Sequence, residues 1–564
     1  MAAMQNGERA ALALAAKNVV ALSPREETDR KMDLAAAMAA IGDLKCIIFK
    51  LKEGKTSMTR TKKIPPLTKD HHHQTIVLKS ALLSRLLLLS LILLWRTLLS
   101  PYDTSAPLNP TCLSNTTSSL PPPPPQRRPL WPSTASAIES SIVWDGVYFV
   151  RIAQCGYEYE QSYAFLPLLP VFISFFAPNS FCSVVPVIGQ RAVLGFSGYV
   201  INNIAFVFAA VYFYRLSVAI LKDRDLALRA SILFCFNPAS IFYSSIYTES
   251  LYALFSIGGL YHLISGRNNI AVLWLALSGF ARSNGVINAG YICFQTMHRA
   301  HNALLRKSTF LVMQVIVGGA LRCICIFVPF FAFQAYGYYN ICVGDSPDKL
   351  RPWCKARVPL LYNYIQSHYW GVGFLRYFQL KQLPNFLLAS PILSMALCSI
   401  VHYAKSEPEK FFSLGFHAST KDKNSAAVFF TPDLGLRSNI IHTTRKASSK
   451  IQDNRSPRPK KQMIKGEVPA LLPEKNELTE KTGYLSVFVL PFIMHLGFLA
   501  ATVFFVMHVQ VATRFLSSSP PLYWFASYLM GSPRSWRWGY MIWAYSAAYI
   551  LLGSLLFSNF YPFT

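Results

Sequence analysis

Long apolar runs recur along this chain of 564 residues and constrain its fold more than any other feature. A helix of about 18 or more apolar residues is long enough to cross the hydrocarbon core of a membrane. Only 14% of the residues are charged, whereas a soluble protein carries about 25%. The sequence therefore predicts an all-α polytopic membrane protein.

About ten of these runs are expected to span the bilayer as helices. The first covers residues 76–100. The others lie near residues 163–180, 191–214, 230–247, 248–265, 270–292, 309–335, 384–404, 484–509 and 539–560. Lys79 and Arg85 lie toward the start of the first span, where long basic side chains can snorkel to the cytosolic interface.

Polar segments divide the chain into four parts. Residues 1–75 are polar and Ala-rich and are predicted to be a disordered cytosolic extension. Residues 405–483 are predicted to be a basic, disordered cytosolic insert. Residues 76–404 and 484–564 then form an N-terminal and a C-terminal transmembrane region.

The expected spans also assign loops to the two sides of the membrane. Three segments, residues 140–169, 336–383 and 510–538, fall on the lumenal side. The turn at residues 222–229 would be lumenal too, although it is basic. Basic loops are usually cytosolic, so the middle spans are miscounted or one of them is re-entrant.

The formal net charge of +27 raises the question of nucleic-acid binding. The basic residues, however, lie in polar stretches beside apolar spans, as the positive-inside rule leads us to expect. We therefore predict no nucleic-acid partner. The 11 cysteines include no CxxC pair and no Cys/His cluster with zinc-ligand spacing, so no metal site is predicted.

Two features are typical of an oxidising lumen. Cys342 and Cys354 flank the polar segment "CVGDSPDKLRPWC" and are candidates for a disulfide. Asn115 begins the sequon Asn-Thr-Thr in a Pro/Ser/Thr-rich segment and is a candidate for N-glycosylation.

Three aromatic-rich stretches, residues 140–169, 351–386 and 508–540, mix flat rings with polar side chains. Single aromatic residues at a membrane interface are explained by the aromatic belt. The belt does not explain the acidic, amide and basic groups among them, whereas a sugar-binding site would use both kinds of group. The candidate ligand contacts are Trp144, Asp145, Glu160, Gln366, Trp370, Gln510 and Arg514.

A further cation lies inside a predicted span, in "GFARSNGVINAGY". Placing Arg282 at a helix centre in the membrane would cost about 2.5–3.5 kcal/mol, so the side chain should face a cavity and a partner. A phosphate suits the guanidinium fork, and snorkelling at a helix end is an equal alternative. Asn284 follows as a candidate ligand contact. Glu249, in "NPASIFYSSIYTESLYALF", either lines the same cavity or joins helices.

Five motifs together closely resemble the GPI mannosyltransferase 2 family, also called phosphatidylinositol-glycan class V. They are "WDGVYFVRIAQCGYEYEQSYAFLPLLP", "NPASIFYSSIYTESLYALF", "ARSNG", "PWCKARVPLLYNYIQSHYWGVGFLRYFQLKQLPNF" and "HVQVATRFLSSSPPLYW". They occur in the family's order. The resemblance covers residues 140–404 and 484–560 and leaves out the first 75 residues and the insert.

The resemblance implies a multi-pass enzyme of the endoplasmic reticulum with the GT-C glycosyltransferase architecture and with catalysis in the N-terminal transmembrane region. Such enzymes transfer mannose from dolichol-phosphate-mannose to the first mannose of a GPI-anchor precursor, forming an α-1,6 bond. A β-linked donor and an α-linked product require inversion, and one carboxylate then accepts the proton of the acceptor hydroxyl. No cofactor is expected besides the lipid donor.

The resemblance also suggests roles for the candidate residues. Asp145, in the first lumenal loop, would be the general base, and Trp144 would shape its pocket. Glu160 is the second-choice acid, with an interfacial charge or cap as its alternative role. Arg282 or Arg514 would stabilise the leaving phosphate. No D-x-D motif follows Asp145, so a mechanism that uses a sugar nucleotide and a metal is not favoured.

Two rival functions come from other classes. A polytopic lipid or sugar transporter would also place polar residues inside the membrane, but no internal repeat is visible. A non-catalytic subunit of GPI assembly would tolerate replacement of Asp145. Besides its two lipid-linked substrates, a small membrane helper subunit is a candidate partner.

Overall fold

The structure is a computed structural model that describes residues 66–100, 102, 112–113, 129–343, 351–430, 483–531 and 536–561. The chain divides into two units, Met1–His71 and His72–Thr564, and almost all described residues belong to the second. Every regular element in the described ranges is helical, which confirms the all-α prediction. Residues 1–65, the sequon at Asn115 and residues 431–482 lie outside the described parts of the chain.

Six described helices are long and apolar enough to cross a membrane. They are α3 (Pro66–Leu98), α9 (Gln190–Leu221), α15 (Thr309–Cys342), α17 (Leu383–Ser406), α22 (Leu490–Phe505) and α25 (Trp536–Ser558). A seventh candidate is the bent pair of α7 (Leu168–Ser180) with residues Cys182–Ile188, whose parts meet at 73°. The polytopic fold is thus confirmed, but a count of ten spans is not.

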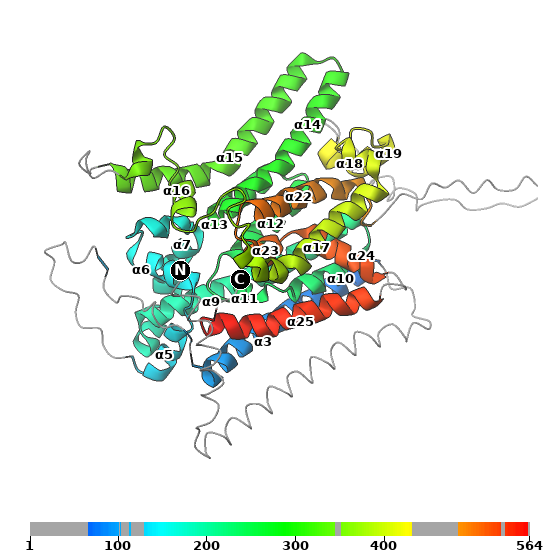
Figure 1. Cartoon of the computed structure of the whole chain (residues 1–564). Helices are drawn as coiled ribbons and strands as arrows, with labels where there is room; N and C mark the ends of the chain where they lie inside the picture. The colour runs from blue at the N-terminus through cyan, green and yellow to red at the C-terminus, as the bar shows by residue number, and fades with distance from the viewer. Residues whose placement is uncertain are drawn as a thin grey trace, which may run out of the picture. The chain divides into compact units, whose positions relative to one another are not determined.

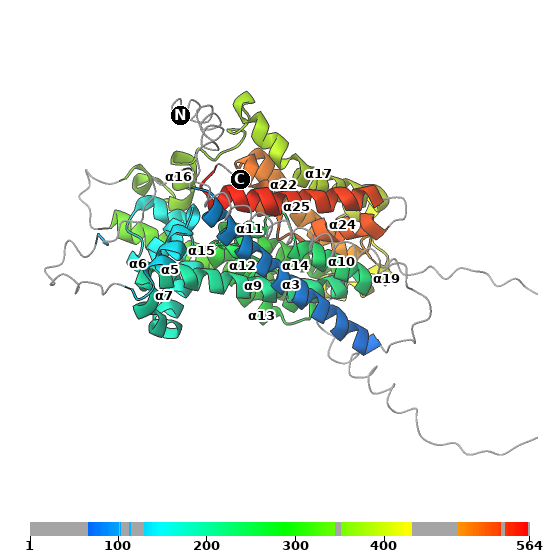
Figure 2. The ribbon, with the colours of Figure 1, turned by 90° about the horizontal axis from the view of Figure 1, so that it is seen from below.

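Several expected spans are shorter helices that pack side by side. Helix α12 (Glu249–Ile264) lies between α9 and α13 (Asn268–Ala281), and α14 (Ala289–Leu305) lies along α15 (Figure 1). On another side, α24 (Pro520–Gly531) packs against α10 (Arg224–Cys235), α22 and α25 (Figure 2). These helices enclose one large apolar core.

The expected span at residues 230–247 is wrong as a continuous helix. Helix α10 is capped by Asp223, whose carboxylate accepts hydrogen bonds from two backbone N–H groups at 3.0 Å, and it ends at Cys235. Pro238 follows, and a separate short helix, α11 (Ser240–Ser244), comes after it. Because proline cannot donate a helical hydrogen bond, the chain breaks here although its composition is apolar.

Arg85 satisfies the carbonyl groups that this break exposes. Its guanidinium donates to the carbonyl oxygens of Cys235 and Ser240 at 3.4 and 3.1 Å. It also donates to the Ser244 hydroxyl at 2.8 Å and lies 3.8 Å from the centre of the Phe206 ring. With 3% of its surface exposed, Arg85 does not snorkel as the sequence suggested. The free carbonyl oxygens at the end of the helix lie closer to the Arg85 guanidinium than the membrane interface does.

The basic turn at residues 222–229 lies at the end of the bundle that the sequence predicts to be cytosolic. The Leu221 carbonyl accepts from the Gly483 N–H at 2.8 Å, at the end of the predicted insert. His73, near the start of α3, lies 3.8 Å from Asp225. The turn therefore lies beside the end of the insert that is predicted to be cytosolic, which disagrees with the lumenal prediction for the turn.

The stretch at residues 510–538 also divides between the two ends. The Ser527 hydroxyl donates to the Leu226 carbonyl at 2.9 Å, so α24 returns to the end that carries the basic turn. At the opposite end, the Trp144 indole donates to the Phe557 carbonyl at 3.1 Å. Only the first part of the stretch lies at the end that carries Asp145.

The insert begins later in the chain, and the extension ends earlier, than the sequence predicted. Residues 405–430 are ordered in α18 (Pro408–Phe412), α19 (Thr420–Ser425) and α20 (Ala427–Phe430). Phe429 and Phe430 are buried, and Gln295 of α14 donates to the Val428 carbonyl at 2.9 Å. The apolar pair anchors this segment despite its many charges. The last residues of the predicted extension continue helix α3 from Pro66.

Candidate active site

A cavity of about 240 Å³ opens at the end of the bundle that carries Asp145. It is lined by residues from segments that are far apart in the sequence. Six of the residues predicted from the sequence line it: Asp145, Arg282, Asn284, Gln366, Trp370 and Arg514. The fold therefore brings all three aromatic-rich stretches and the intramembrane arginine to one site.

Asp145 is the first residue of α6 (Asp145–Cys155), after a sharp turn at Trp144. Trp144 has φ of 53°, a left-handed conformation that costs a bulky residue about 1–3 kcal/mol. Its ring packs 5.6 Å from Phe560, and its indole is bonded to Phe557 as described above. Trp144 does not line the cavity but holds the turn that directs Asp145 into it.

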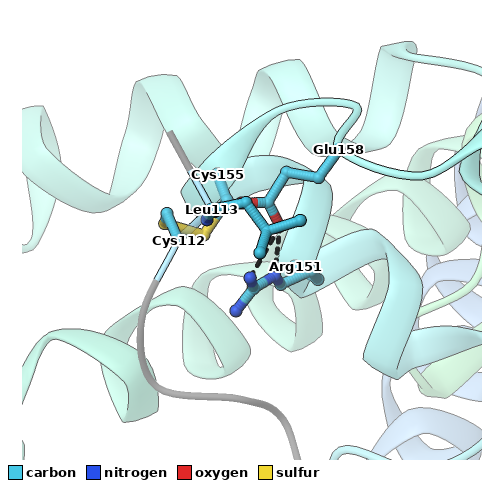
Figure 3. Close-up of a disulfide and its surroundings, with 5 residues drawn as sticks. All are labelled: Cys112, Leu113, Arg151, Cys155 and Glu158. Carbon is cyan, nitrogen blue, oxygen red and sulfur yellow. Dashed lines mark hydrogen bonds and ion pairs between the residues drawn. A yellow bond between two sulfur atoms is a disulfide. The ribbon is translucent and has the colours of Figure 1, made fainter. Parts of the chain in front are cut away.

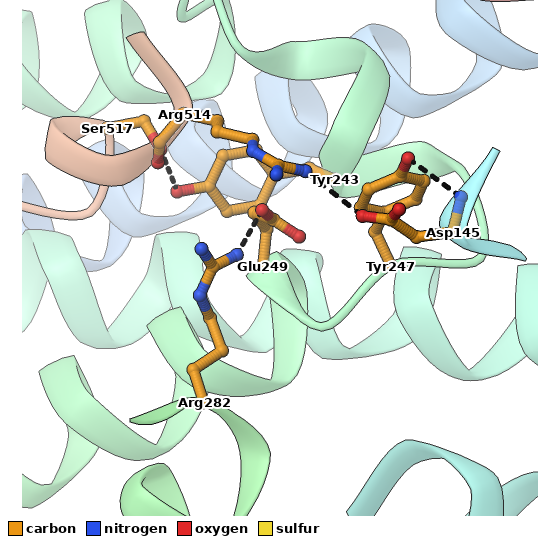
Figure 4. Close-up of polar contacts among 7 residues, drawn as sticks. All are labelled: Asp145, Tyr243, Tyr247, Glu249, Arg282, Arg514 and Ser517. Carbon is orange, nitrogen blue, oxygen red and sulfur yellow. Dashed lines mark hydrogen bonds and ion pairs between the residues drawn. The ribbon is translucent and has the colours of Figure 1, made fainter. Parts of the chain in front are cut away.

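Arg514 is the cation beside Asp145. Its guanidinium lies 3.4 Å from the Asp145 carboxylate and 5.3 and 5.6 Å from the ring centres of Phe242 and Tyr247 (Figure 4). Burial alone would lower the pKa of Arg514, but the carboxylates of Asp145 and Glu249 outweigh burial and raise it. Arg514, on α23 (Ala512–Leu516), therefore stays charged.

Arg282 has a second carboxylate as its partner. It follows the end of α13 and forms an ion pair with Glu249, the first residue of α12 (Figure 4). The Glu249 side chain is 2% exposed and that of Arg282 is 18% exposed. Sequence reasoning left the role of Glu249 open. The sequence did contain one signal for this ion pair: an acidic residue, Glu249, and a basic residue, Arg282, lie in neighbouring apolar segments.

Three cavity residues, Tyr247, Tyr362 and His508, were missed from the sequence. Tyr247 accepts a hydrogen bond from the Asp145 N–H at 3.1 Å, and burial and the Asp145 charge raise its pKa well above the usual value. The Tyr362 hydroxyl lies 2.7 Å from the Ser283 hydroxyl. Their neighbours in sequence are equally aromatic, so no local signal distinguished them.

His508 adds a polar group that is neutral at physiological pH. Its Nε2 atom lies 2.7 Å from the Trp370 carbonyl oxygen. Burial lowers the pKa of His508, and the hydrogen bond to Trp370 only partly opposes this. The cavity's positive charge therefore comes from the two arginines.

Asn284 presents an amide that has no hydrogen-bond partner among the described residues. Both its Nδ2 and Oδ1 atoms are buried, and the residue is 6% exposed. An unsatisfied buried polar group costs about 1–3 kcal/mol. A site that tolerates this cost at a cavity wall is suited to a hydroxyl-bearing ligand.

Besides Trp144, two predicted contacts lie outside the cavity. Glu160 accepts hydrogen bonds from the Trp353 indole at 2.6 Å and the Tyr369 hydroxyl at 2.8 Å. Gln510 accepts from the Tyr377 hydroxyl. Neither residue lines the cavity. The side chains of Glu160 and Gln510 instead accept hydrogen bonds from aromatic residues of neighbouring loops.

Two disulfides brace this end of the molecule. Cys342 and Cys354, the candidate pair, are joined with their Cα atoms 5.8 Å apart. Cys112 and Cys155, which the sequence did not suggest, are joined with Cα atoms 5.4 Å apart.

The second disulfide lies beside a charged group. Glu158 pairs with Arg151 at 2.6 Å and accepts from the Leu113 N–H at 2.5 Å (Figure 3). The sulfurs of Cys112 and Cys155 and the Glu158 carboxylate lie within 4.8 Å of one another. They do not form a thiolate metal site, because the disulfide uses both sulfurs.

The fold and cavity define a class: a polytopic helical membrane protein with a charged, aromatic site at one end, suited to a ligand with polar and apolar parts. A family model described as "Mannosyltransferase (PIG-V)" matches residues 73–564. The chain therefore belongs to this mannosyltransferase family, and the resemblance inferred from its motifs and the prediction of an enzyme are both confirmed.

Curated relatives support the same assignment. GPI alpha-1,6-mannosyltransferase 2 of Mus musculus is 29% identical over 409 residues, covering 69% of this chain and 72% of that protein. GPI mannosyltransferase 2 of Schizosaccharomyces pombe is 34% identical over 259 residues, covering 44% of this chain and 51% of that protein.

A solved structure of an archaeal oligosaccharyltransferase from Archaeoglobus fulgidus, in complex with an inhibitory peptide and a dolichol-phosphate, is 12% identical. The match covers 88% of this chain and 56% of that chain, with a TM-score of 0.34. So low a score supports no statement about this chain's site, and the GT-C architecture stays a prediction.

Proposed function

We propose that this protein transfers mannose from dolichol-phosphate-mannose to the first mannose of a GPI-anchor precursor. The transfer forms an α-1,6 bond with inversion, in the membrane of the endoplasmic reticulum. The names of the relatives support a GPI mannosyltransferase. The single observation that carries the mechanism is the placement of Asp145 3.4 Å from Arg514 in the wall of one cavity.

The reaction needs one group to accept a proton and one to stabilise the leaving phosphate. The acceptor hydroxyl oxygen forms a bond to the anomeric carbon while its proton moves to the Asp145 carboxylate. The bond between the anomeric carbon and the phosphate oxygen breaks, and its electron pair leaves with dolichyl phosphate. The Arg514 guanidinium stabilises the negative charge on that phosphate.

The other cavity groups orient the sugar. Trp370 offers a flat apolar ring to a pyranose face, and Gln366 and Asn284 offer amide groups to its hydroxyls. Fixing both reactants in one geometry lowers the barrier by removing the entropy of encounter. The proposal requires no cofactor or metal, because the guanidinium supplies the positive charge.

The rival functions are tested by the purified protein alone. We expect the full chain in lipid nanodiscs to transfer radiolabelled mannose from dolichol-phosphate-mannose to a monomannosylated GPI precursor. Movement of the donor across a vesicle membrane without transfer would instead support a transporter. No transfer by the purified chain, with transfer restored only by a second protein while Asp145→Asn stays fully active, would support a non-catalytic subunit.

A further inference from the structure

The two guanidinium groups of the cavity are held in different ways. Arg282 is paired with Glu249, whose side chain is 2% exposed, whereas Arg514 is paired with Asp145, whose side chain is 36% exposed. Breaking the first pair would leave a bare carboxylate in the interior, which is strongly unfavourable. The second pair faces the cavity, where water or a ligand can take the place of either partner.

The contact between Arg514 and Asp145 is also long. Charge-assisted hydrogen bonds between an N–H cation and a carboxylate are usually about 2.7–2.9 Å long, and this one is 3.4 Å. Partly exposed ion pairs at such distances contribute little. Of the two arginines, Arg514 is therefore the one whose carboxylate partner can be exchanged.

Arg514 itself is fixed. Its guanidinium packs near the faces of Phe242 and Tyr247, and its carbonyl accepts from the Ser517 hydroxyl at 2.6 Å. Ser517 in turn lies 2.9 Å from the hydroxyl of Tyr243 (Figure 4). An anion that enters the cavity therefore meets a cation in a set position.

We propose that Arg514 exchanges partners: it holds Asp145 in the lipid-free protein, and the phosphate of the incoming donor replaces the Asp145 carboxylate. This inference rests on the proposed function, which identifies the donor as a polyprenyl phosphate sugar. In the ion pair an Nη1–H group of Arg514 occupies the Oδ2 atom of Asp145, and the exchange frees that oxygen to accept a proton. Donor binding thus activates the general base, and the enzyme must bind the donor before it activates the acceptor.

The exchange predicts that removing the Asp145 charge strengthens phosphate binding. The probe is citronellyl phosphate, a short soluble polyprenyl phosphate, titrated calorimetrically into the full chain in nanodiscs. Asp145→Asn should bind it about two- to tenfold more tightly than the unmodified chain, the range expected for release of a partly exposed pair. Asp145→Ser should show the same gain, which guards against a folding defect of one variant.

Three controls make the effect specific. Arg514→Gln should bind the probe weakly, and adding Asp145→Asn to it should give no further gain, because the competition needs Arg514. Citronellol, which lacks the phosphate, should bind all variants alike. Glu139→Gln, which removes a partly buried carboxylate of α5 (Pro132–Ser140) outside the cavity, should leave binding unchanged.

Unchanged affinity in Asp145→Asn would overturn the exchange, as would an equal gain in the Arg514→Gln background. These titrations measure no mannosyl transfer, so the result is separate from the test of the proposed function. An Asp145→Asn chain that transfers mannose normally would refute the general base, whatever its affinity for the probe.

Discussion

At the scale of single residues, the site is a set of four charges of alternating sign. Glu249 lies between the two arginines, and Asp145 completes the set beyond Arg514 (Figure 4). The motif containing Asp145 was visible in the sequence, and so was the cost of Arg282 in an apolar segment. The pairing of Arg282 with Glu249 was not, because 33 residues separate them and only the packing of α12 against α13 brings them together.

The buried pair should be more important for stability than for chemistry. Arg282→Met removes the ion-pair partner of the buried Glu249 carboxylate, and loss of one partner of a buried pair typically costs about 3–5 kcal/mol. We expect a clear drop in the thermal unfolding midpoint in detergent. The double variant Arg282→Met/Glu249→Leu should recover part of it, and a double variant as unstable as the sum of both singles would contradict this role.

Asn284 should be more important for ligand binding than for the stability of the fold. Because its amide has no partner among the described residues, Asn284→Leu removes an unsatisfied group whose burial costs about 1–3 kcal/mol. The thermal unfolding midpoint should stay the same or rise, while KM for dolichol-phosphate-mannose or for the acceptor rises about tenfold, as for a lost hydrogen bond to a ligand. A lower midpoint with an unchanged KM would make Asn284 a structural residue.

At the scale of the elements, the broken helix α10–α11 positions the site. Tyr243 lies in α11, and Tyr247 and Glu249 follow directly after it. The apolar composition of residues 230–247 predicts a span equally well whether the helix is continuous or broken. The sequence also gave no reason to turn Arg85 inward, because the acceptors that it meets exist only once the helix has broken.

Arg85 should therefore be needed for stability and for activity, although it does not line the cavity. Arg85→Met leaves the carbonyls of Cys235 and Ser240 without their donor, and we expect a lower unfolding midpoint and a fall in kcat. Lys79→Met, on the same helix but exposed, is the matched control and should change neither quantity. Equal behaviour of the two variants would refute a positioning role for Arg85.

At the scale of the whole molecule, the two ends of the bundle carry different chemistry. The cavity and the two disulfides of the described residues lie at the end with Asp145, and the basic turn after α9 lies at the other end. The sequence predicted that the two ends of the bundle differ. It also predicted, from hydropathy, a membrane span at residues 163–180. The chain bends by 73° after Ser180, where both parts of the bent pair contact α9, and the apolar pattern gave no sign of this bend.

The sidedness of the chain follows from this arrangement. In intact microsomes, a membrane-impermeant maleimide should label Lys222→Cys above the level of the parent chain, because the turn lies beside the end of the insert that is predicted to be cytosolic. Leu130→Cys, at an exposed position near the cavity end, should be labelled only after detergent opens the membrane. Protection of Lys222→Cys in intact microsomes would contradict the arrangement.

The most direct test of the account is the rate of mannosyl transfer by Asp145→Asn, measured in a single turnover with the purified chain. This substitution keeps the size of the side chain and removes its ability to accept a proton. We predict a loss of about 10²–10⁴-fold, the usual contribution of general base catalysis, in a protein that still binds citronellyl phosphate. Transfer by Asp145→Asn at the unmodified rate would contradict the account.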